Sequence, residues 1–298
     1  MDGLVLFDKP LGLSSHSATN RVRKLCGVAR AGHVGSLDPL ATGMLPICLG
    51  EATKIAGLVA SHDKSYRFTL LLGARTATGD AEGDIVERLP VLQLDLATVN
   101  NVLAGMTGPQ TQVPPMFSAI KQGGQPLYRL ARKGQTVERQ PRNIRIDQLL
   151  CTQLSGAVLE LFVSCSKGTY VRVLGEDIAR ALGSCGHLIA LRRDWVEPFQ
   201  GLRMWPLEEI AVALEANSRD FLLATSTALP LMPRLTLNAA EARRLLQGQT
   251  ISRVAVAAGT CWLQDEAGLG LGLGHVESLA PDSGAIIRPQ RMFTQPLP

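Results

Sequence analysis

Apolar and polar residues alternate with a period of two in several short stretches of the chain. Such spacing places the apolar side chains on one face of a strand, and short apolar runs bounded by turn residues indicate strands as well. The predicted strands cover Gly3–Phe7, Lys64–Gly73, Val158–Cys165 and Cys261–Gln264, and His187–Arg193 is predicted to be a further buried segment.

Helical spacing with capping residues and terminating glycines marks other stretches. Ser14 or Ser15 is suited to cap a helix that contains Val22 and Leu25 and ends at Gly27. Asn238 and Glu241 have the spacing of a capping box, which predicts a helix from there to Gly248. Further helices are predicted over Leu94–Gly105, through Ile178 to Gly183, and over Leu207–Leu223.

Proline-containing stretches divide the chain into a long and a short part. Glu197–Pro206 and Leu229–Pro233 have the composition of linkers. Beyond them, the glycine-rich run GLGLGLG does not have the spacing of a dinucleotide-binding loop, and it favours a small β-rich domain. A chain of 298 residues is long enough for one large domain and one small one.

The composition changes this picture little. With 46% hydrophobic and 19% charged residues, wholesale disorder is excluded, and a net charge of +4 permits a nucleic-acid partner without requiring one. The six cysteines form no CxxC pair, so we expect free thiols rather than a zinc site. Neither a signal peptide nor a membrane span is recognisable, and we expect a soluble, cytoplasmic protein.

Asp38 is the most informative single residue. It is the only formally charged residue between Arg30 and Glu51, and Leu37, Pro39 and Leu40 flank it. One interpretation is local, because Asp-Pro is a common helix start with the aspartate as N-cap. The other is chemical, because an ionised carboxylate in apolar surroundings requires a partner or takes part in a reaction.

Arg172 is the most attractive partner for Asp38. A guanidinium can hold a carboxylate with two hydrogen bonds and keep it ionised, although Arg172 could equally be a surface residue at a strand end. Tyr66 lies on the apolar face of its predicted strand, where a core position and a place in a site are both open.

The segment from Lys121 to Arg145 is strongly basic. It holds seven positive residues against Glu138 alone, a local balance of +6, with glycines and Tyr128 between them. Charge runs are often only solvated faces, yet basic side chains mixed with glycine and an aromatic residue suit an arm that lies along a phosphate backbone. The loop Thr76–Asp84 lacks the twelfth-position Glu of an EF-hand, so a calcium site is rejected.

Four separated segments together resemble one family. GHVGSLDPLATGMLPICLGEATK, KSYRF, VPPMFSAIK and CSKGTYVRVLGEDI are similar, in order and spacing, to the bacterial tRNA pseudouridine-55 synthases of the TruB family. The opening DKPLGLSSH is similar to the start of that family as well. The likeness runs from about Leu4 to Arg193 and is looser beyond Pro233.

The resemblance implies an α+β fold. A central mixed, largely antiparallel sheet flanked by helices would form a pseudouridine synthase domain over residues 1–230, with an RNA-clasping arm at about 119–145. A small PUA-like RNA-binding domain would follow over residues 233–298. The implied reaction converts the uridine at position 55 in the T loop of tRNA to pseudouridine.

The resemblance also assigns roles to residues. Asp38 would be the catalytic carboxylate, Tyr66 would contact the base, Arg172 would pair with Asp38, and Leu191 would help to close the pocket. His33 would pack against the RNA where the nucleotide leaves the loop, and Lys9 would support the active-site end of the sheet. The remaining substrate-binding residues would be Tyr170 and Asp80.

The reaction is an isomerisation, so it requires no cofactor, metal or protein partner, and we expect a monomer that binds the T stem-loop of tRNA. Whether Asp38 attacks the sugar, attacks the ring or removes a sugar proton stays open. Two other hypotheses remain: an RNA-folding chaperone that performs no chemistry, and the guide-RNA-dependent synthase subunit of archaea and eukaryotes, which shares these segments.

Overall fold

The computed structural model describes residues 1–59, 62–254, 256–278 and 284–297, and its main feature is a nine-stranded mixed sheet. The strand order is β13-β1-β3-β12-β4-β11-β10-β7, with β2 paired to β3. Its strands are β1 Gly3–Lys9, β2 Ala31–His33, β3 Ala41–Leu49, β4 Lys64–Leu72, β7 Gly108–Gln112, β10 Arg142–Ser155, β11 Val158–Cys165, β12 Gly186–Val196 and β13 Leu222–Leu223.

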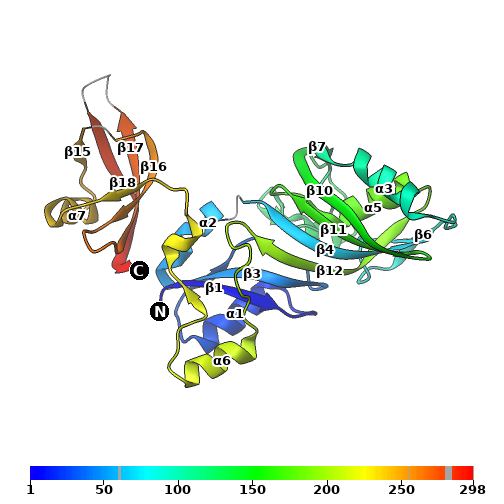
Figure 1. The fold of residues 1–298 in the computed structure, drawn as a ribbon, viewed down its shortest axis with the longest axis horizontal. Helices are drawn as coiled ribbons and strands as arrows, with labels where there is room; N and C mark the ends of the chain where they lie inside the picture. The colour runs from blue at the N-terminus through cyan, green and yellow to red at the C-terminus, as the bar shows by residue number, and fades with distance from the viewer. Residues whose placement is uncertain (60–61, 255, 279–283, 298) are drawn as a thin grey trace.

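Only β3 and β12 run parallel in this sheet, and every other pairing within it is antiparallel. The mixed, largely antiparallel sheet that the resemblance predicted is therefore confirmed. Figure 1 shows this sheet extending from β1 to β7 across the molecule. Two short ribbons lie outside it: β5 Ala74–Thr76 with β6 Ile85–Arg88, and β8 Lys121–Gln122 with β9 Gln125–Pro126.

Most helices pack on one face of the sheet, whereas η1 and α2 pack on the other face at β1 and β3, because alternate side chains of a strand point to opposite faces. On β4, Tyr66, Phe68 and Leu70 join the main core with Leu174 and Ile178 of α5, while Arg67 points to the opposite, open face. The helices are α1 Ser15–Leu25, α2 Ala56–Val59, α3 Leu96–Gly105, α4 Leu127–Ala131, α5 Val171–Ala181, α6 Leu207–Glu215 and α7 Ala239–Leu246, with 3-10 turns η1 Gly50–Ile55 and η2 Thr225–Ala228.

A second, five-stranded sheet forms the C-terminal part of the chain, drawn in orange and red in Figure 1. Its order is β14-β16-β17-β18-β15, and most of the glycine-rich run lies within β17, while Gly268 lies in the turn before this strand. The predicted capping box is present, because Asn238 and Glu241 cap α7 reciprocally. The strands are β14 Arg234–Thr236, β15 Ile251–Arg253, β16 Gly259–Gln264, β17 Gly270–Ser278 and β18 Ala285–Leu297.

Two sequence predictions about element boundaries are wrong. The helix expected over Leu207–Leu223 ends at Glu215, since Asn217 adopts a positive φ of 55° and the chain then turns into β13. The basic arm does not extend to Arg145, because β10 begins at Arg142 and joins the main sheet. Arg145 itself forms ion pairs with Asp63 and Asp147.

Glu51 links the C-terminal sheet to the large one. Its side chain is only 4% exposed, and its oxygens lie 2.6 Å from Arg30 and 2.7 Å from Lys54. The backbone N–H of Thr294 donates to the same carboxylate at 2.7 Å. Burial raises the pKa of Glu51, but the hydrogen bonds from Lys54 and Thr294 and the charge of Lys54 outweigh it and lower the pKa to about 2.

We expect Glu51→Gln to lower the free energy of unfolding by about 1–3 kcal/mol at pH 7, because it removes a charge that satisfies buried donors. A carboxyl whose pKa is lowered in the folded state stabilises the fold at any pH above its ordinary pKa of 4.5. This stabilisation is lost as the pH falls toward 2. Urea unfolding at pH 7 and at lower pH measures the difference in the free energy of unfolding between the wild type and Glu51→Gln. Glu277→Gln, which breaks an exposed pair with Arg288, is the control. Equal effects of the two substitutions would contradict the role of Glu51.

Candidate functional site

Asp38 lies in the loop between β2 and β3. The Ala41 N–H donates to the Asp38 carbonyl at 3.0 Å, and β3 begins at Ala41, so no helix follows Pro39. The interpretation of Asp38 as a helix N-cap is therefore wrong. Gly43 allows the close approach of β3 to β12, because an ideal Cβ there would lie 2.2 Å from the Arg193 carbonyl oxygen.

Arg172, in the first turn of α5, lies next to the Asp38 carboxylate. Its Nη2 is 3.0 Å from Asp38 Oδ2, and the arginine side chain is 6% exposed. The two-bond grip on Asp38 expected from the sequence is not formed. The hydrogen bonds of the guanidinium go instead to the Thr78 carbonyl and the Phe117 carbonyl, each at 2.7 Å. Arg172 therefore joins the Asp38 loop to two other segments.

The surroundings of Asp38 affect its ionisation in opposite directions. Burial raises the pKa of Asp38, the charge of Arg172 works against that rise, and the nearby Asp80 adds to it. The side chain still has 43% of its surface accessible, through the cavity that it lines. The carboxylate is thus partly dehydrated and reachable, which suits a group that acts on a bound molecule.

Asp80 lies behind Arg172 rather than in the cavity. Its Oδ2 is 3.7 Å from Arg172 Nε, and its Oδ1 accepts hydrogen bonds from the Thr78 hydroxyl at 2.5 Å and the Glu82 N–H at 3.1 Å. Asp80 is 2% exposed and is not among the residues that line the cavity. Its geometry is that of a group that positions Arg172, which differs from the substrate contact expected from the sequence.

A cavity of about 380 Å³ surrounds the Asp38 carboxylate. Tyr66 from β4, Leu191 from β12 and Tyr170 before α5 line it together with Asp38 and Arg172, as does the root of the arm from Ser118 to Ile120. The structure thus brings together five of the eight residues singled out from the sequence. The volume falls within the range of small-ligand pockets.

Gln112 fixes the position of Tyr170. Its side-chain carbonyl accepts from the Tyr170 N–H at 2.8 Å, and its amide donates to the Tyr170 carbonyl at 3.2 Å. Burial raises the pKa of the Tyr170 hydroxyl and also that of Tyr66, so both are neutral, hydrogen-bonding groups near neutral pH.

His33 and Lys9 do not line the cavity. The His33 ring lies on β2, with its nitrogens 3.1 Å from the Thr19 hydroxyl and 3.2 Å from the Ser36 hydroxyl. Lys9 is fully buried at the end of β1, and its ammonium donates to the carbonyls of Pro10, Leu13 and Pro39. Burial lowers the pKa of Lys9 to about 8.

Sequence reasoning missed two cationic side chains in the cavity wall, Lys64 and Arg193. The period of two could have found them. Lys64 lies two residues before Tyr66 on β4, and Arg193 lies two residues after Leu191 on β12, so each shares a face with a residue that was singled out.

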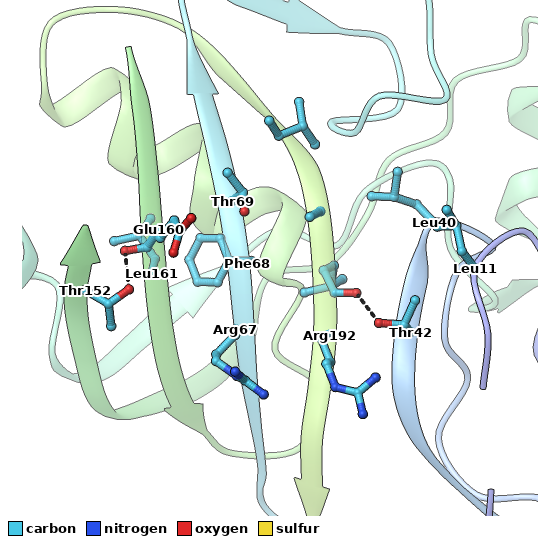
Figure 2. Close-up of a pocket in the computed structure, with 13 residues that line it drawn as sticks. Leu11, Leu40, Thr42, Arg67, Phe68, Thr69, Thr152, Glu160, Leu161 and Arg192 are labelled. Carbon is cyan, nitrogen blue, oxygen red and sulfur yellow. Dashed lines mark hydrogen bonds between the residues drawn. The ribbon is translucent and has the colours of Figure 1, made fainter. Parts of the chain in front are cut away.

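A second cavity, of about 410 Å³, opens on the other face of the sheet (Figure 2). Arg67 and Arg192 border it, but their guanidinium groups are paired with Asp194 at 2.8 Å and Asp8 at 2.9 Å. Leu11 and Leu40 border it at the side of the Asp38 loop, as Figure 2 shows. The Asp38 cavity is the better candidate site. It contains a carboxylate whose pKa is shifted, and polar side chains from several elements point into it.

The described residues contain no group of three or more His, Cys, Asp and Glu side chains that could hold a metal ion. All six cysteines are free thiols. None of the helices described is long and apolar enough to cross a bilayer.

Several known proteins are similar to this chain. The model of the TruB family pseudouridylate synthase N-terminal domain matches residues 23–171. A protein of Nitrosococcus oceani named tRNA pseudouridine synthase B is 45% identical over 98% of this chain and 95% of its own length. One of Aromatoleum aromaticum with the same name is 44% identical over 99% and 93%.

Solved structures support the fold. A Cbf5-Nop10-Gar1 complex contains a chain that superposes with a TM-score of 0.74 at 19% identity, covering 98% of this chain and 85% of that one. An archaeal box H/ACA sRNP Nop10-Cbf5 complex gives 0.71 at 18%, covering 98% and 86%. The family model and these relatives show that the chain belongs to the TruB family of pseudouridylate synthases.

Proposed function

We propose that this enzyme converts the uridine at position 55 in the T loop of tRNA to pseudouridine, and that Asp38 is its catalytic carboxylate. The observation that carries the proposal is the Asp38–Arg172 ion pair at 3.0 Å in the wall of a cavity of nucleotide size. The names of the relatives, tRNA pseudouridine synthase B, support tRNA as the substrate.

The reaction breaks the bond between C1′ of the ribose and N1 of the uracil and forms a bond between C1′ and C5. The proton on C5 is lost and N1 gains one, so substrate and product are isomers. An ionised Asp38 can serve as nucleophile or as base in this sequence, and both routes remain open. Arg172 keeps the carboxylate charged and fixed in place.

The target uridine must leave its stack to reach Asp38. Extruding a nucleotide costs a few kcal/mol, which stacking on an aromatic side chain and phosphate contacts can offset. Tyr66 and Leu191 line the cavity, so we infer that they hold the base between them. His33, outside the cavity, is proposed to pack against the RNA at its entrance, while Lys9 and Asp80 support the loops around it.

The arm supplies the cationic surface for the RNA backbone. Lys121, Arg132 and Lys133 are exposed, and the Arg132 guanidinium lies 5.8 Å from the Tyr128 ring centroid. Side chains of this kind bind phosphates and unstacked bases. We assign catalysis to residues 1–230 and RNA binding to a PUA-like domain over residues 233–298, and we propose that the chain acts as a monomer without a protein partner or cofactor.

The purified chain alone, without added metal, should form one pseudouridine in an unmodified tRNA transcript, at the T-loop uridine. Carbodiimide adducts mapped by primer extension locate it. Asp38→Asn should retain RNA binding and reduce the rate by roughly 1,000-fold or more, because an amide is neither a nucleophile nor a base. Asp194→Asn, which alters a carboxylate on the open face, should retain activity.

A product at another site, or a requirement for a guide RNA, would contradict this assignment. Full RNA binding by the wild type with no product would favour the hypothesis of an RNA-folding chaperone.

Arg172→Lys should lower kcat by about 100-fold or more with little change in RNA affinity, since one ammonium cannot bond Thr78 and Phe117 while it faces Asp38. Steady-state rates at saturating RNA measure kcat, and direct binding measures the affinity. Arg180→Lys, on the exposed face of the same helix, is the matched control and should be unaffected. Equal turnover by Arg172→Lys would refute the pairing role.

A further inference from the structure

Two buried cations line the Asp38 cavity, and neither forms an ion pair with a described residue. Lys64 is 7% exposed and Arg193 is 1% exposed. No carboxylate oxygen of the described residues lies within 4.0 Å of either one. Taking a charge out of water is unfavourable unless a partner compensates it. The described residues supply no carboxylate partner for Lys64 or Arg193.

Lys9 shows what a purely structural buried cation looks like in this protein. Its ammonium donates to three carbonyl oxygens, at 3.0, 2.7 and 3.5 Å. Lys64, by contrast, donates only to the His62 carbonyl among the described residues. An ammonium has three donor hydrogens, so Lys64 retains donor capacity.

Arg193 is incompletely bonded as well. Its Nε donates to the Met44 carbonyl at 2.7 Å and its Nη2 to the Gly35 carbonyl at 2.9 Å. The Tyr66 hydroxyl interacts with the same guanidinium, and the side chain borders the cavity. A guanidinium carries five N–H donors, so three such interactions leave two donors for another acceptor.

The two cations lie together beneath Gly35. An ideal Cβ on this glycine would be 3.3 Å from Arg193 Nη1 and 3.5 Å from Lys64 Cε. Any larger residue would therefore cover the pair. Burial lowers the pKa of Lys64 to about 8, and the positive charge of Arg193 lowers it as well. An anion at this place would raise the pKa of Lys64 again, because an opposite charge stabilises the ammonium.

We propose that Lys64 and Arg193 form an anion subsite that receives a phosphodiester oxygen of the bound RNA, next to the nucleotide that enters the cavity. This inference rests on the proposed function, because RNA supplies the anion. A phosphodiester is favoured over the charge that develops on the uracil, since only a permanent anion compensates a permanent buried charge when the complex forms. The subsite thus fixes the backbone while Asp38 acts on the sugar and base.

The test is a thermodynamic cycle between protein and RNA. T stem-loop RNAs, each with one methylphosphonate at a position around the target uridine, are bound to Asp38→Asn protein, which excludes turnover. The same scan is repeated with Lys64→Met added, and Arg67→Met is the control because it removes a cation from the other face of β4.

With Lys64 present, one methylphosphonate should weaken binding about tenfold or more, as expected for a lost charged hydrogen bond. With Lys64→Met, that same methylphosphonate should cost no more than its neighbours. The slope of log affinity against log salt should fall by about one for Lys64→Met, and Arg67→Met should retain the full methylphosphonate effect.

The proposal is overturned if no single methylphosphonate weakens binding to protein with Lys64, a result that no folding defect can imitate because only the RNA is changed. It is also overturned if the penalty is the same with and without Lys64. Loss of turnover by Lys64→Met at unchanged affinity and salt slope would assign the charges to the reaction instead. Product formation by the wild type on the unmodified stem-loop is scored separately, and its absence would refute the proposed function whatever the binding cycle shows.

Discussion

The Arg172 guanidinium is the interaction on which the site depends. It lies 3.0 Å from Asp38 and 3.7 Å from Asp80, and it donates to the Thr78 and Phe117 carbonyls. The Asp38 loop, the loop before β6 and the root of the arm are therefore held by one side chain that is 6% exposed. Because a buried guanidinium is costly without acceptors, each of these segments is constrained to the place where it compensates that charge.

The sheet determines which side chains can reach this point. β12 lies between β3 and β4, parallel to β3 and antiparallel to β4, so residues from distant parts of the chain share one face. Tyr66, Leu191 and Arg193 face the cavity, whereas Arg67 and Arg192 face the open side and find carboxylates there. The same alternation places one set of side chains toward the Asp38 cavity and the other set, with its ion pairs, on the open face.

Local signals predicted the regular elements well, because caps and alternation act within a few residues. Ser14 caps α1 and the Asn238 capping box begins α7, as the sequence indicates. Local signals did not predict the effects of long-range pairing. The helix after Pro206 ends before β13, which pairs with β1, and Arg142 belongs to the main sheet instead of the arm. The pairing of Asp38 with Arg172 was among the sequence hypotheses, but the carbonyl partners of Arg172 depend on loop backbones that no local pattern encodes. Alternation along β4 and β12 places Lys64 and Arg193 on the cavity face, but it does not predict that neither forms an ion pair there.

The most direct measurement is the pH dependence of the single-turnover rate for the wild type and for Arg172→Gln. Burial raises the pKa of Asp38 above its ordinary value of 3.8, and the charge of Arg172 limits that rise. If Asp38 acts ionised and Arg172 keeps it so, the acidic limb of the wild-type profile lies above the ordinary range and moves to still higher pH in the variant. An acidic limb at the same pH in both proteins would contradict this account.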